Sequence, residues 1–155
     1  MCERFWQIAD SVPFPLLVTN GKDGYPQARP MRLLDREGEG LWFATSRSSR
    51  KVAEIDADPR VTVLFPRTDH FNYALLRGCA EVVDEDERKH ALWRDEWRDD
   101  WPSGPTDPDY VLLRVIGEWG SYYYGYADET REIRFVADGS RESSPKTEGG
   151  RETAG

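Results

Sequence analysis

The segment that decides the fold lies near the start of the chain and reads Phe14-Pro15-Leu16-Leu17-Val18-Thr19-Asn20-Gly21-Lys22-Asp23-Gly24-Tyr25-Pro26-Gln27-Ala28-Arg29-Pro30-Met31-Arg32-Leu33-Leu34. Its apolar first part, Phe14 to Thr19, is closed by Gly, Asn and Asp residues at positions 20–24, which is typical of a β-hairpin turn. The return strand is expected over residues 26–34. Because proline has no backbone N–H, Pro30 predicts a sheet edge or a bulge within that strand.

The same short-strand pattern continues along the chain. Strands are predicted at residues 41–45, 61–65, 73–83, 110–126 and 132–136, with a turn at 36–40, a bulge at Gly78 and interruptions at Gly117 and Gly120. Helical periodicity is confined to residues 5–9, to residues 52–55 and to a stretch that begins at residues 84–87. Strands that do not alternate regularly with helices favour an antiparallel barrel or sandwich over a doubly wound nucleotide-binding fold.

The third helical stretch has an unusual aromatic content. Trp93, Trp97 and Trp101 are spaced by four residues, which predicts one helix that ends before Pro102 and packs its aromatic stripe on the barrel. A ligand wall and a subunit contact are the alternatives for the stripe.

Composition and charge exclude several classes of protein. The 155 residues suggest one domain, and 29 Asp and Glu against 21 Lys and Arg give a net charge of −8. This acidity argues against nucleic-acid binding and against an anionic membrane surface, since both require a basic face. The chain has no long apolar run, no signal-peptide start and no metal-binding motif. We therefore expect a cytoplasmic protein without a metal site.

The end of the chain differs from the rest. Residues 138–155 contain no aromatic or branched aliphatic side chain, so they cannot bury enough surface to offset the entropy of ordering. The sequence therefore predicts a folded domain over residues 1–137 and a disordered polar tail over residues 138–155.

The segment with the clearest chemistry runs from residue 43 to residue 55. A predicted strand ends in Thr45 and Ser46, and a helix opens after a Ser cap with Arg50 and Lys51 in its first turn. Hydroxyls, backbone N–H groups at a helix start, an Arg and a Lys are the groups that bind a phosphate monoester. The sequence predicts a phosphate cradle here, and a basic surface turn paired with nearby acids is the alternative.

Arginines also interrupt the first hairpin. Arg29 and Arg32 lie within an otherwise apolar strand, and a buried arginine is costly unless it is paired or bound to an anion. Ligand contact and a water-facing edge strand are both compatible with the pattern.

Taken in order, these motifs resemble a known family. Arg29-Pro30-Met31, Leu41 to Thr45, Ser49-Arg50-Lys51 and Asp58 to Pro66 are similar to the pyridoxamine 5′-phosphate oxidase-like family of FMN-binding split barrels. Within it, residues 78–84 and 101–110 resemble the general stress protein 26 group. The resemblance covers about residues 5 to 125. It implies a mainly β fold, a six-stranded antiparallel split β-barrel of Greek-key type with a few flanking helices.

The resemblance further implies a homodimer with FMN in the grooves between subunits, each site drawing on both chains. Ser49, Arg50 and Lys51 would hold the FMN phosphate. The residues implied to line the flavin and its ribityl chain or to flank the ring and phosphate are Arg29, Pro30, Met31, Arg32, Trp42, Phe43, Ala44 and Thr45. The partner subunit would contribute aromatic residues from the last strand, for which the candidates are Trp119, Tyr122, Tyr123 and Tyr124.

Two departures from the family pattern affect the expected activity. Tyr73, an implied cofactor contact, stands where the oxidases proper carry glutamine, and the Arg-x-His element for the substrate phosphate is missing. These departures argue against vitamin B6 oxidation. The expected function is an FMN-dependent oxidoreductase acting on a small molecule or a reduced electron donor, with no catalytic residue identified. The alternatives are a non-catalytic, flavin-buffering stress protein and a reductase that uses the deazaflavin F420.

Overall fold

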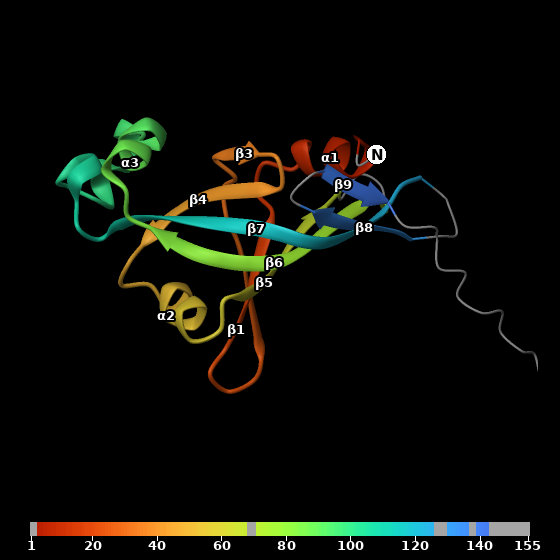
Figure 1. Cartoon of the computed structure of the whole chain (residues 1–155). Coiled ribbons are helices and arrows are strands. Elements are labelled where there is room, and N and C mark those ends of the chain that lie inside the picture. The colour runs from red at the N-terminus through yellow and green to blue at the C-terminus, as the bar shows by residue number, and fades with distance from the viewer. Residues whose placement is uncertain (1–2, 68–70, 126–129, 137–138, 143–155) are drawn as a thin grey trace, which may run out of the picture.

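Figure 1 shows the computed structural model, which describes residues 3–67, 71–125, 130–136 and 139–142. The strands are β1 (Leu16–Asn20), β2 (Pro26–Pro30), β3 (Asp35–Glu37), β4 (Gly40–Ser46), β5 (Arg60–Pro66), β6 (Tyr73–Val83), β7 (Tyr110–Tyr123), β8 (Arg131–Val136) and β9 (Gly139–Glu142). The helices are α1 (Glu3–Asp10), α2 (Arg50–Ala57) and α3 (Asp86–Leu92), with the 3₁₀ turns η1 (Asp95–Asp99) and η2 (Gly104–Thr106). In this described part, no helix is long and apolar enough to cross a membrane.

All strands belong to one antiparallel sheet in the order β2-β1-β5-β6-β7-β4-β3, to which β8 and then β9 are added beside β7. The predicted mainly β class with a few flanking helices is therefore confirmed. The long strands β6 and β7 run together along the middle of the molecule (Figure 1). One edge of β7 pairs first with β4, through residues 110–116, and then with β8, through residues 119–122. This change of partner splits the sheet into two parts.

The bulge predicted at Gly78 is confirmed, since the β6–β7 register shifts between Arg77 and Gly78. A Cβ atom on Gly78 would lie 1.9 Å from the carbonyl oxygen of Ile116. Only glycine therefore allows the two central strands to approach this closely.

The main core packs between the sheet and the helices α1 and α2. Phe5 of α1 is fully buried, and its ring packs edge-on against those of Phe65 and Phe135 at centroid distances of 6.5 and 5.5 Å. Phe5, Ile8 and Ala9 form the buried face of α1, as the helical spacing predicts.

The predicted continuous tryptophan helix is wrong, although the packing of its aromatic side chains is confirmed. The helix stops at Leu92 and Trp93 turns to an extended backbone, after which Trp97 lies in η1. The indole rings gather instead around Tyr110 of β7, with Trp101 at 5.1 Å and Trp93 at 5.2 Å. Tyr110 is fully buried in this second core. The packing of the indole rings around it stabilises the bent chain by more than the local helical preference would stabilise a straight helix.

Tyr110 gives a testable consequence for stability. Burial raises the pKa of Tyr110 to about 12, so the unfolded chain loses the phenol proton first, at a pH of about 10. The stabilisation that the neutral, buried phenol of Tyr110 contributes to the fold is complete below pH 10. It falls by about 1.4 kcal/mol per pH unit between pH 10 and 12. We expect the unfolding free energy of the wild type to drop more steeply over this range than that of Tyr110→Phe, as measured by urea denaturation. Parallel curves for the two proteins would contradict the expectation.

In the first part of the chain one local prediction is wrong and another is correct only in part. The return strand of the hairpin ends at Pro30, not at residue 34, because Met31 and Leu33 donate to the carbonyls of Pro15 and Pro13, and these prolines have no N–H to donate back. The turn predicted at residues 36–40 is confirmed but is shorter: it occupies residues 38–39, because β3 extends to Glu37 and pairs with β4 from Gly40.

The predicted polar tail lies mostly outside the described residues. Within it, Gly139–Glu142 forms β9, which pairs with β8, so these four residues form a strand where a disordered chain is predicted. For residues 138 and 143–155 the tail stays a prediction.

Candidate functional site

The connection between β4 and α2, called the cradle below because a phosphate site is predicted there, is anchored by Asp109, which directly precedes β7. The backbone N–H of Ser48 donates to Asp109 Oδ1 at 2.9 Å, and that of Arg47 donates to the Asp109 carbonyl at 2.7 Å. The bond from the Ser48 N–H is the main reason why the pKa of Asp109 is lowered. The sequence analysis missed this anchor, because residues 48 and 109 are distant in the chain.

Hydroxyl and ammonium groups converge at the start of α2. Ser49 is the N-cap by backbone geometry, but its side chain makes no capping bond and lies 3.5 Å from Thr45 Oγ1. Lys51 Nζ donates to the same Thr45 oxygen at 2.9 Å. Burial, and secondly the positive charge of Arg29, lower the pKa of Lys51. Arg50 is exposed beside them. The first N–H groups of a helix also lack intrahelical partners, so the cradle is rich in donors.

Arg29 of β2 lies beside this cluster. Its contacts decide whether it faces water at the sheet edge, which is one of the two interpretations that the sequence leaves open. Its Nη1 donates to Thr19 Oγ1 at 2.7 Å, and its Nη2 lies 3.3 Å from Glu54 Oε1. The Arg29 side chain is 22% exposed and that of Glu54 only 3%. Arg29 is therefore a paired arginine facing α2, not an edge arginine facing water.

Glu54 is a site residue that the sequence analysis missed. It lies on the buried side of α2, between the predicted core positions Val52 and Ile55. Its position three residues after Lys51 is the signal that could have located it, because such residues are neighbours on a helix surface.

A cleft of about 480 Å³ adjoins the cradle between the β1–β2 turn and α2. Arg50 and Glu54 belong to both. The lining residues are Gly21, Lys22, Asp23, Gln27, Arg50, Ala53 and Glu54.

The other predicted contacts, on β4 and at or just after the end of β2, differ in whether their side chains are accessible to a ligand. Phe43 is fully buried in the main core and Trp42 is 4% exposed in the second core. Their side chains could reach a ligand only after repacking, which leaves their main-chain atoms. Met31 is half-buried against the main core, and Pro30 is exposed. Arg32 is half-exposed and lies 3.4 Å from Glu96 of η1, so it is not part of the cradle.

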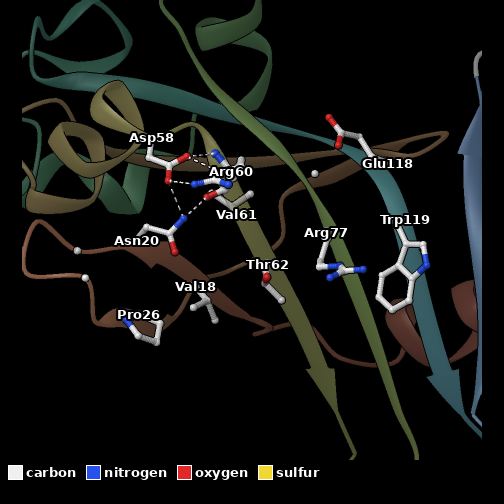
Figure 2. Close-up of a pocket in the computed structure, with 13 residues that line it drawn as sticks. Val18, Asn20, Pro26, Asp58, Arg60, Val61, Thr62, Arg77, Glu118 and Trp119 are labelled. Atoms are coloured by element: carbon white, nitrogen blue, oxygen red, sulfur yellow. Dashed lines mark hydrogen bonds and ion pairs between the residues drawn. The ribbon is translucent and has the colours of Figure 1, made fainter.

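A second, larger groove of about 730 Å³ lies on the outer face of β1, β5, β6 and β7 (Figure 2). At one end the guanidinium of Arg77 stacks over the Trp119 ring at 3.8 Å. At the other end Asp58 accepts hydrogen bonds from Arg60 and Asn20. Thr45, Ser49 and Lys51 are not among its lining residues. Within one chain, Trp119 is therefore part of a site distinct from the cradle.

The remaining aromatic candidates lie further along the same strands. Tyr73 and Tyr123 are cross-strand partners whose rings stack at 6.3 Å, on the face that carries Arg77 and Trp119. Tyr122 points the other way and is buried, while Tyr124 is 41% exposed with the Arg4 guanidinium over its ring. The outer face thus brings together Tyr73, Trp119 and Tyr123 but not Tyr122.

Comparison with known proteins gives a consistent result. A family profile described as Pyridoxamine 5'-phosphate oxidase like matches residues 1–138. A pyridoxine/pyridoxamine 5'-phosphate oxidase of Thermobifida fusca is 26% identical over 139 residues, which cover 77% of this chain and 63% of that protein. The chain thus spans less than two thirds of the length of this curated relative, and about a third of that of two matched oxidases from Cupriavidus species.

Solved structures share the fold. A protein from Clostridium acetobutylicum related to general stress protein 26, of the pyridoxinephosphate oxidase family, superimposes with a TM-score of 0.72 at 28% identity, covering 88% of this chain and 94% of that one. A pyridoxamine 5'-phosphate oxidase-related, FMN binding protein from Nostoc punctiforme gives a TM-score of 0.68 at 14% identity, covering 92% and 95%, which is a likeness of fold alone. The predicted split-barrel class is thereby confirmed.

Proposed function

The chain belongs to the Pyridoxamine 5'-phosphate oxidase like family, and from this premise we propose that it is an FMN-binding flavoprotein acting as an FMN-dependent oxidoreductase. The observation that carries the proposal is the convergence of Lys51, Thr45 and Ser49 beside Arg29. Ammonium, guanidinium and hydroxyl donors at a helix start match the oxygens of a phosphate monoester.

The cradle offers several hydrogen-bond donors and positive charges, which are the groups that the oxygens of the FMN phosphate require. Lys51 is half-buried and its pKa is lowered, so it lacks a full set of compensating charges. A bound phosphate would supply that compensation and raise the Lys51 pKa again. When bound, FMN supplies the hydride and electron transfer, and the protein supplies its binding, orientation and electrostatic environment.

The proposal includes a homodimer, since the cradle and the aromatic groove of one chain are separate. A partner would bring Trp119 and Tyr123 to the flavin held at this chain's cradle. The outer face of β1, β5, β6 and β7 also carries half-buried apolar side chains, among them Val18, Leu64 and Leu75, which suit a subunit contact. We expect sedimentation at twice the chain mass, with and without FMN. A monomer with stoichiometric FMN would contradict the two-chain site.

Parallel titration of the protein with FMN and riboflavin, followed by flavin fluorescence, tests the proposed cradle. The two flavins differ only in the phosphate, so tight FMN binding and much weaker riboflavin binding are expected. Equal affinities would show that the cradle does not hold the phosphate. Turnover of the FMN-loaded protein with NAD(P)H and an electron acceptor then distinguishes an oxidoreductase from a non-catalytic, flavin-buffering protein.

A further inference from the structure

A buried carboxylate lies among the cations of the cradle, where it would repel any anion bound there. Glu54 is 3% exposed, and its Oε1 lies 3.3 Å from Arg29 Nη2 and accepts from Thr19 Oγ1 at 3.4 Å. Burying a carboxylate is costly even when it is paired. Its place beside a proposed phosphate site therefore calls for a role in ligand binding.

The charges of the cradle suggest that role. Arg29, Arg50 and Lys51 carry three positive charges, and Glu54 reduces the sum to two when all four groups are ionised. Arg47 and Asp109, at the base of the cradle, add one charge of each sign and leave this sum unchanged. A phosphate monoester, with a second pKa of about 6, carries close to two negative charges at neutral pH. With Glu54 present, the cradle balances one terminal phosphate and has no positive charge in excess for a second anionic group.

The position of Glu54 strengthens the argument. A Cβ atom on Gly21 would lie 3.3 Å from Glu54 Oε2, so this oxygen is directed to the β1–β2 turn and lines the cleft beside the cradle. Lys22 and Asp23 also line the cleft, but both are exposed and of opposite sign, so they largely offset each other in solvent. Arg50 lines the cleft as well, but its side chain is exposed and is already counted toward the phosphate. Glu54 is the buried negative charge that a ligand extending past its phosphate into the cleft would meet.

We propose that Glu54 is a specificity-determining residue that restricts the site to flavins ending at the phosphate. Flavins whose phosphate continues into a further anionic group are disfavoured, whether the extension is the second phosphate of FAD or the acidic tail of F420. This inference rests on the proposed function, because it presupposes that the cradle holds a flavin phosphate.

The test compares dissociation constants for riboflavin, FMN and FAD in the wild type, Glu54→Gln and Asp56→Asn. The glutamine keeps an oxygen that can accept from Arg29 and removes the charge. Asp56 is exposed on the same helix, so its variant controls for the change in net charge. In Glu54→Gln we expect the preference for FMN over FAD to fall at least tenfold, chiefly because FAD binds more tightly. In Asp56→Asn it should stay within twofold of the wild type.

A second variant guards against misfolding of Glu54→Gln. Ala53 is exposed and lines the same cleft, so Ala53→Lys adds a compensating positive charge without disturbing the core. It should lower the preference for FMN over FAD in the same direction.

Each other outcome has a defined meaning. An unchanged FMN-to-FAD preference in Ala53→Lys and in any folded Glu54→Gln, or a wild type that binds FAD as tightly as FMN, would overturn the role of Glu54. An equal loss of FMN and FAD affinity in Glu54→Gln would also overturn it, since that shows only a scaffold role. A wild type that binds FMN no better than riboflavin would instead refute the proposed function, and the inference with it.

Discussion

Replacing Arg50 and Lys51 together by alanine should weaken FMN binding by about two to four orders of magnitude and leave riboflavin binding nearly unchanged. Each cation is expected to make a charge-assisted hydrogen bond to the phosphate, worth about 1.5–3 kcal/mol. Lys51 also loses its bond to Thr45, which leaves the hydroxyl of that residue free to rotate. The measurement is the pair of dissociation constants from fluorescence titration at fixed ionic strength.

A matched control removes the same charge elsewhere. Arg98 of η1 and Arg134 of β8 are both exposed and lie on elements other than α2, so Arg98→Ala/Arg134→Ala should bind FMN within about threefold of the wild type. If the Arg50 and Lys51 double variant behaves like this control, the start of α2 is a basic surface turn. If FMN and riboflavin affinities fall together, the variant has damaged the fold instead of the phosphate contact.

Gly78→Ala should cost about 3 kcal/mol of unfolding free energy or more, at the upper end of overpacking effects. The new methyl group would lie 1.9 Å from the Ile116 carbonyl oxygen and 2.8 Å from its carbon. Both atoms are backbone, so no side-chain rotation relieves the clash. Relief requires separating β6 from β7, and the two strands pair over most of their length.

Urea denaturation of Gly78→Ala measures this cost, and Cys79→Ala is the neighbouring control. Cys79 is only half-buried, and its Sγ contacts Glu118, which lines the groove on the outer face, so its truncation should change the unfolding free energy by less than about 1 kcal/mol. A Gly78→Ala protein as stable as this control would show that the bulge can relax, and that its glycine is not a steric requirement.

The strands were largely predictable, because period-2 alternation and turn residues are local signals. The range 73–83 for β6 and the strand–turn–helix at residues 43–55 agree with the structure. Predictions failed where a distant partner decides the backbone: Tyr110 breaks the expected tryptophan helix, and the prolines at 13 and 15 end β2 early. Neither effect can be recognised from the neighbouring residues alone.

The sequence by itself determined the fold class and the donor groups of the cradle, since Thr45, Ser49, Arg50 and Lys51 lie within seven consecutive residues and their arrangement follows from one strand end and one helix start. Only the tertiary structure decided how that cradle is held and balanced. Arg29 and Glu54 are 25 residues apart, and Ser48 and Asp109 are 61 apart. A hydrogen bond or ion pair depends on distances of a few ångströms, and for residues so far apart in the chain these distances are set by the packing of the sheet against α2.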